Sequence, residues 1–145
     1  MIFNIGSYTL DVDVEATKCG YAQVPAENCG CGCSGCRNFL QAAAQMPEKA
    51  RTLLTTMGVD PAKFVHISPM CALEGGAKLD YLGWYHLCGH IVKGMQGLVD
   101  DQLCDGFSFS FTNQCQMADV DFPRPLIQMD FYAVLPWVLE EENTY

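Results

Sequence analysis

The sequence predicts an α+β domain in which an antiparallel sheet carries a helical hairpin on one face. Residues 106–112 alternate phenylalanine with serine or threonine, which is the period-two pattern of a half-buried strand. Two successive runs of helix-forming residues, 37–46 and 47–57, follow one another without a strand pattern between them. Half of the 145 residues are hydrophobic and only 17% are charged, which suffices for one compact core. We therefore expect residues 1–145 to form a single domain.

The first elements expected along the chain are a β-hairpin and a short helix. Residues 2–5 and 8–14 alternate polar and apolar side chains around Gly6-Ser7, as in two strands joined by a tight turn. A helix over 15–23 is expected next, and Pro25 ends its pattern because proline has no amide hydrogen to donate.

The helical hairpin is expected directly after a cysteine-rich segment. Ser34 is placed to cap the first helix, whose residues 37–46 are mostly strong helix formers. Pro47 suits the first turn of a second helix, and Gly58 is a natural stop beyond its end.

The rest of the chain predicts strands and an acidic end. The strands are expected at 64–67, 79–92, 106–112 and 126–135. Asp100, Asp101 and Asp105 are expected in a solvated turn, because their spacing does not match a calcium-binding loop. Residues 140–145 are expected to fray in solvent.

The charge of the chain argues against two classes of partner. The net charge is −9, and residues 95–145 hold nine acidic residues against one arginine. Nucleic-acid phosphates and anionic membranes both require clustered lysine and arginine. We expect neither a nucleic acid nor a membrane as partner. The acidity favours solubility through self-repulsion, with a basic partner as the alternative.

The cysteine content and the amino-terminal residues together predict a compartment. Residues 1–7 lack the basic start and the apolar stretch of a secretory signal, and no run approaches the length of a membrane helix. Nine cysteines are an odd number, which a closed disulfide framework does not explain. We expect a cytoplasmic protein whose cysteines are reduced thiols, metal ligands or a redox pair.

The strongest signal is a metal-binding turn at residues 29–36. Cys29, Cys31, Cys33 and Cys36 are separated only by glycine and serine. Glycine allows the backbone to turn several short side chains toward one point, and thiolates are the soft ligands that zinc prefers. The helix expected next adds the positive end of its dipole, which stabilises ionised sulfur.

A fourth ligand is expected from a distant segment. His86, Cys88 and His90 alternate, so on a strand they share one face. The predicted ligand set is Cys31, Cys33, Cys36 and Cys88. Cys29, His86 and His90 are the alternative metal ligands.

Three hypotheses about function follow from this turn. In the first, zinc is structural and ties the first helix to the sheet in a non-enzymatic binding domain, whose protein or small-molecule partner is unknown. In the second, Cys33 and Cys36 form the pair of a thiol redox enzyme or sensor, with Arg37 beside them. In the third, zinc keeps an open position and His86 or His90 acts as acid or base. An iron–sulfur cluster could use the same ligands, although the spacing differs from the ferredoxin patterns.

Three segments also carry a resemblance to a group of proteins. They are CGCSGCRNF (31–39), GWYHLCG (83–89) and DFPRP (121–125). In this order, and in a chain of this size, they resemble a group of small uncharacterised bacterial proteins. The resemblance implies a cytoplasmic bacterial origin and assigns no catalytic residue.

Overall fold

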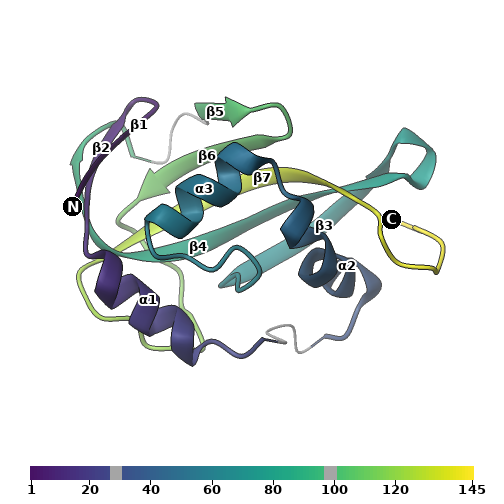
Figure 1. Ribbon diagram of the computed structural model, residues 1–145, viewed down its shortest axis with the longest axis horizontal. Helices are drawn as coiled ribbons and strands as arrows, with labels where there is room; N and C mark the ends of the chain where they lie inside the picture. Colours follow the sequence, from purple (N-terminus) through teal and green to yellow (C-terminus); the bar gives the residue numbers. More distant parts are fainter. Residues whose placement is uncertain (27–30, 97–100) are drawn as a thin grey trace.

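The fold is described from a computed structural model, which describes residues 1–26, 31–96 and 101–145 (Figure 1). Its strands are β1 (Ile2–Ile5), β2 (Tyr8–Val12), β3 (His66–Leu73), β4 (Lys78–Lys93), β5 (Asp101–Cys104), β6 (Phe107–Thr112) and β7 (Leu126–Pro136). Its α-helices are α1 (Val14–Gln23), α2 (Ser34–Ala42) and α3 (Glu48–Thr56). All strand pairs are antiparallel, so the predicted α+β class is confirmed.

The long strand β4 organises the sheet. Within the described ranges the strand order is β1-β2-β4-β7-β6-β5, and β3 pairs with β4 outside this path. One edge of β4 is shared, because β3 pairs with residues 78–84 and β2 pairs with residues 89–93. The other edge pairs with β7 over eleven consecutive positions without a register shift. β4 therefore runs through the whole sheet and links the two ends of the molecule.

The amino-terminal elements agree with the expectation from sequence. β1 and β2 form a hairpin around Gly6, whose φ of +56° suits glycine. Asp13 caps α1 by accepting the N–H of Ala16 at 2.9 Å. Thr17 on the buried side of α1 also donates its hydroxyl hydrogen to the Asp13 carbonyl at 2.8 Å, which fixes the start of the helix.

The two successive helices are present, with one correction at their start. Ser34 is already helical, and the N-cap of α2 is Cys33, which makes no side-chain capping hydrogen bond. A 3₁₀ turn, Ala43–Gln45, replaces the last turn of the expected first helix, and α3 begins after Pro47. A cysteine therefore occupies the position where the peptide N–H groups of α2 point outward.

The sheet and α2 share an aromatic core. Phe107, Phe109 and Phe111 of β6 are all buried, as their alternation with polar residues predicts. Phe39 of α2 lies edge-on to Tyr81 of β4, with ring centroids 5.2 Å apart. Phe39 also contacts Phe131 of β7, so α2 is seated on the two central strands by apolar packing.

Three segments differ from the expectation. The strand expected at 64–67 begins instead at His66 and continues to Leu73 as β3. Asp101 belongs to a short edge strand, β5, instead of a solvated turn, and it accepts hydrogen bonds from the backbone and hydroxyl of Ser7. Asp105 lies in the turn after β5, as expected, and Asp100 lies outside the described residues. The acidic end of the chain is not frayed. The Ala72 N–H donates to the Tyr145 carbonyl at 3.3 Å, and the Asn143 amide donates to the Lys78 carbonyl at 3.0 Å.

Within the described part of the chain, none of the helices has both the length and the apolar character needed to cross a bilayer.

Candidate metal centre

Three cysteine sulfur atoms meet at the amino-terminal end of α2. The Sγ atoms of Cys31, Cys33 and Cys36 all lie within 4.8 Å of one another. Cys31 Sγ is 3.2 Å from Cys33 Sγ and 3.6 Å from Cys36 Sγ. Among the residues that the structure describes, no other group of three histidine, cysteine or acidic side chains comes this close together. These three residues are called the cysteine triad below.

Local backbone conformation brings the triad together. Gly32 has a φ of +64°, a left-handed conformation that side-chain-bearing residues rarely adopt. This turn places Cys31 Sγ 3.5 Å from the Cys33 backbone nitrogen, which donates its hydrogen to the sulfur. Cys36 lies in the first turn of α2 and faces the same point. The positive end of the helix dipole therefore lies beside all three sulfur atoms.

The spacing of the sulfur atoms fits one metal ion. Zinc–thiolate bonds are about 2.3 Å long, so two thiolates at tetrahedral corners lie about 3.8 Å apart. The triad reaches this spacing if its shorter separations of 3.2 Å and 3.6 Å widen by roughly 0.2 to 0.6 Å. Side-chain rotation alone can supply so small a movement.

The triad is closed on one side and open on the other. The Cys36 side chain is buried, Cys33 is partly buried and Cys31 is exposed. An ion from solvent can therefore reach the sulfur atoms without unfolding of the core.

Buried hydrogen bonds fasten the start of α2 to the sheet. The Tyr81 hydroxyl of β4 donates to the Gly35 carbonyl at 2.7 Å, and it accepts an N–H from the Asn38 amide at 3.1 Å. The Asn38 side chain also accepts the Val138 N–H at 2.8 Å. Burial raises the pKa of Tyr81, so its hydroxyl keeps its hydrogen at neutral pH. The triad is thus presented by a helix end with a fixed position.

The last residues of the chain cover the same helix end. The Tyr145 hydroxyl accepts the Gly35 N–H at 3.0 Å. A Cβ at Gly35 would lie 2.5 Å from Pro69 Cγ and 2.8 Å from this hydroxyl, so only glycine allows the approach. Burial and a hydrogen bond with Cys33 raise the pKa of the Tyr145 phenol, which stays protonated beside the triad.

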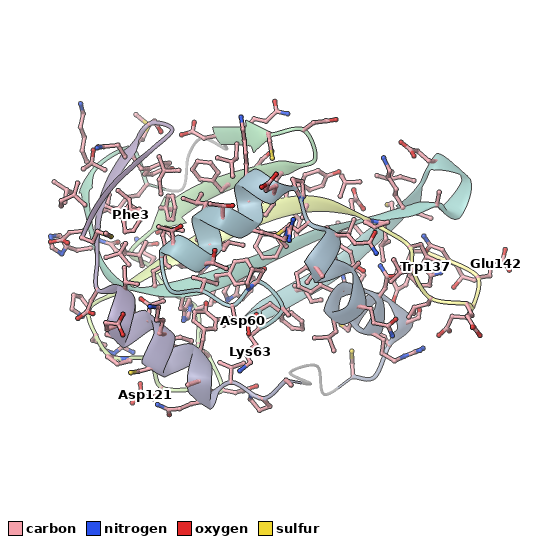
Figure 2. All side chains as sticks on the ribbon, in the orientation of Figure 1. Phe3, Asp60, Lys63, Asp121, Trp137 and Glu142 are labelled. Atoms are coloured by element: carbon pink, nitrogen blue, oxygen red, sulfur yellow. The ribbon has the colours of Figure 1, made fainter. Side chains whose placement is uncertain are left out.

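An ion pair joins α2 to the same terminal segment. Arg37 Nη1 lies 2.6 Å from Glu141 Oε1, and Arg37 Nε donates to the Gly32 carbonyl at 3.3 Å. The pKa of Arg37 is raised chiefly by the hydrogen bond to Glu141, and further by the charge of Cys33. Figure 2 shows Trp137 and Glu142 of the terminal segment at this end of the molecule.

The structure does not bring Cys88 to the triad, which corrects the predicted ligand set. Cys88 is buried on β4, and its N–H donates to the Thr17 hydroxyl of α1 at 3.0 Å. Tyr81, the β4 residue bonded to Gly35, is seven residues away from Cys88, or about 23 Å along a strand. Figure 1 shows α1 and α2 at opposite ends of the molecule. Burial raises the pKa of the Cys88 thiol, which makes it a poor ligand.

The alternative ligands lie elsewhere as well. His86 is buried against Gln128 of β7, with its Nε2 3.3 Å from the Gln128 side-chain oxygen, and burial lowers its pKa. His90 is exposed opposite Asp11 of β2, on the wall of a separate cavity of about 720 Å³. Cys29 lies outside the described residues. The sheet register therefore separates both histidines from the triad.

Tyr81, Asn38 and Tyr145 are site residues that the sequence interpretation missed. Tyr81 and Asn38 act through the fold, and nothing in their local sequence indicates this. Tyr145 carried a signal, because Trp137 and Tyr145 flank the acidic end and aromatic side chains are usually packed. Their ring centroids are 6.4 Å apart.

Comparisons of the chain with protein-family models, with curated proteins and with solved structures found no match. The geometry of the described residues therefore carries the functional interpretation.

Proposed function

We propose that this chain is a non-enzymatic binding domain that holds one zinc ion through Cys31, Cys33 and Cys36. The observation that carries the proposal is the approach of three sulfur atoms to within 4.8 Å of one another at a helix start. Three thiolates at this spacing are a soft ligand set, which favours zinc over hard ions such as magnesium or calcium.

The proposed ion has a local effect on the structure. Its three ligands lie within six residues, so the ion fixes the turn before α2 and ties no distant strand to a helix. Cys36 belongs to the hydrophobic core and Cys33 packs against it, whereas Cys31 is exposed. The part that zinc orders is thus an exposed turn, which suits contact with a partner.

Binding is favoured over catalysis by the groups around the triad. The contacts of its sulfur atoms include each other, the Cys33 backbone N–H and the Tyr145 phenol. His86 and His90, the histidines considered as acid–base groups, lie at the far end of β4.

Metal analysis tests the proposal directly. Protein purified under reducing conditions is incubated with zinc, separated from unbound ion and analysed by mass spectrometry. We expect one zinc per chain in the wild type and none in the Cys33→Ser/Cys36→Ser variant. The matched control is Cys19→Ser/Cys104→Ser, which removes two thiols outside the triad and should leave one zinc bound. A wild type that takes up no zinc, or a triad variant that binds as well, contradicts the proposal.

A redox role for Cys33 and Cys36 is the second candidate, favoured by their placement at a helix start beside Arg37. In this reaction the two thiols form a disulfide and pass two electrons and two protons to another disulfide, such as oxidised glutathione. Incubation of metal-free protein with glutathione buffers separates the candidates. A reversible Cys33–Cys36 disulfide that zinc does not prevent supports the redox role, and uniformly slow oxidation excludes it.

A further inference from the structure

The three thiols of the cysteine triad differ in how far solvent reaches them. Cys31 is exposed and Cys33 is partly buried, whereas Cys36 is only 4% exposed and belongs to the hydrophobic core. A thiol reacts with a dissolved disulfide only where the two sulfur atoms can meet, so access decides which thiol reacts first. Cys31 is therefore the member of the triad that a small disulfide in solvent meets first.

Of the two other sulfur atoms in the triad, that of Cys33 lies nearer to Cys31. Cys31 Sγ is 3.2 Å from Cys33 Sγ and 3.6 Å from Cys36 Sγ. The left-handed turn at Gly32 holds the first pair together, and the Cys33 N–H donates to Cys31 Sγ at 3.5 Å. A new sulfur–sulfur bond therefore needs the smaller approach between Cys31 and Cys33.

The helix restrains Cys36 more than Cys33. Cys36 lies inside the first turn of α2, directly after Gly35, whose carbonyl accepts the Tyr81 hydroxyl at 2.7 Å. Cys33 is the N-cap of the same helix, has an extended backbone and makes no side-chain capping hydrogen bond. The Cys33 sulfur can therefore turn toward Cys31 without the loss of a helix-capping bond.

We propose that glutathione disulfide oxidises the triad to a Cys31–Cys33 disulfide and thereby releases the zinc ion. The release rests on the proposed zinc site, whereas the choice of pair rests on access and distance alone. The C-x-x-C spacing would instead favour Cys33 with Cys36. The Cys31–Cys33 disulfide removes two of the three thiolate ligands, and the remaining thiolate of Cys36 is too few for a stable zinc site.

The oxidation proceeds in two thiol–disulfide exchange steps. The Cys31 sulfur first bonds to one sulfur of glutathione disulfide, whose sulfur–sulfur bond breaks, and one glutathione leaves as a thiolate. The Cys33 sulfur then bonds to the Cys31 sulfur and displaces the second glutathione. Two electrons thus pass from the cysteine sulfurs to the oxidant. Each glutathione thiolate takes up the proton that a cysteine thiol loses, or a proton from water where zinc had already displaced it.

Disulfide mapping in the metal-free full chain tests the choice of pair. Reduced protein is incubated with glutathione disulfide, and its free thiols are alkylated at mildly acidic pH. The species that has lost two hydrogens and carries no glutathione is then reduced, labelled with a second reagent and analysed by tandem mass spectrometry. We expect the second label on Cys31 and Cys33 and the first label on Cys36. A second label on Cys36, or the absence of an intramolecular disulfide, overturns the proposal.

Two single variants form a matched pair, because each removes one thiol of the triad. Cys36→Ser keeps the proposed pair and should form the disulfide at a rate within about twofold of the wild type. Cys31→Ser should form one roughly tenfold more slowly, because its remaining thiols are partly buried and buried. Circular dichroism shows whether both variants fold, and the mapping in the wild type does not depend on them. Equal rates in two folded variants contradict the assignment.

Zinc release is measured separately, on zinc-loaded protein with a chromogenic chelator too weak to strip the reduced chain. Glutathione disulfide should release one zinc for each disulfide formed, and dithiothreitol should restore binding. Zinc that stays bound after the Cys31–Cys33 disulfide has formed overturns the proposed release. A chain that never takes up zinc overturns the proposed function and the release with it, whereas the metal-free mapping decides the choice of pair in either case.

Discussion

Two cysteine-bearing segments of this chain use the same side chain in opposite ways. In the turn before α2, three thiols lie close together, and one of them is exposed. In β4, Cys88 is a single thiol in the core, with its N–H bonded to Thr17 and its pKa raised by burial. The first segment suits a metal ion and the second is part of the packing.

The difference lies in how each segment reaches its partners. Cys31, Cys33 and Cys36 are at most five residues apart, so the chain itself keeps them close and a glycine turn completes the approach. Cys88 could join them only if the sheet register placed it near α2, and the register places Tyr81 there instead. Local motifs are thus reliable guides to a site, whereas distant ligands depend on the fold.

Zinc affinity should distinguish the two segments most strongly when one thiol is removed at a time. Cys36→Ala should lower zinc affinity by roughly 100-fold or more, because it deletes a ligand. Cys88→Ala should leave the affinity unchanged. Competition with a chromogenic chelator measures both. Equal losses in the two variants would restore Cys88 as a ligand.

Stability in metal-free protein should distinguish Cys88 from Cys31, the exposed member of the triad. Cys88→Ala removes a buried side chain and should lower the free energy of unfolding by about 1 kcal/mol. Cys31→Ala changes an exposed residue and should have almost no effect in metal-free protein. Urea denaturation in the presence of a chelator provides the values. A Cys31 variant that is the less stable of the two contradicts this assignment.

The β4 segment should also respond to pH through His86. Burial lowers the folded-state pKa of His86 below its unfolded value of about 6.5. The unfolded chain therefore takes up the proton first as the pH falls. The stabilisation is complete above about pH 6.5 and is lost as the pH falls toward the folded pKa.

Urea denaturation between about pH 7.5 and 5.5 checks this window. His86→Gln should have a shallower pH dependence than the wild type, and His66→Gln serves as the control at another strand position. Parallel curves for His86→Gln and the wild type would show that His86 does not cause the loss.

Zinc affinity should depend least on Tyr145, whose hydroxyl lies beside the triad. Tyr145→Phe removes the hydroxyl that accepts the Gly35 N–H and contacts Cys33. Zinc affinity should change by only a few-fold, because no ligand is lost, and Tyr132→Phe on β7 is the matched control. Affinities from the same chelator competition decide the matter. A loss as large as that of Cys36→Ala would make Tyr145 a direct ligand.

The elements with strong local patterns could be predicted from sequence. The alternation at residues 107–111, the short helix over 15–23 and the two runs of helix formers all depend on nearest neighbours, and the structure contains these elements. The approach of Cys31, Cys33 and Cys36 was predictable for the same reason. Zinc as the ion, a cytoplasmic location and a bacterial origin remain predictions.

Most of the features that failed depend on distant contacts. β5 pairs with β6 across the two-residue turn Asp105-Gly106, a local hairpin signal that the sequence interpretation missed, and only the contact of Asp101 with Ser7 is distant in sequence. The terminal segment is ordered by Arg37, Gly35 and Ala72, all far away in sequence. The prediction of Cys88 as a ligand depends on the sheet register, which its flanking histidines do not determine.

Zinc-edge X-ray absorption on the wild type and on Cys33→Ser/Cys36→Ser is the most direct measurement. It should show a first shell dominated by sulfur at about 2.3 Å in the wild type and no such shell in the variant. A shell of nitrogen and oxygen alone, or a sulfur shell that survives both substitutions, would show that the turn before α2 does not hold the ion.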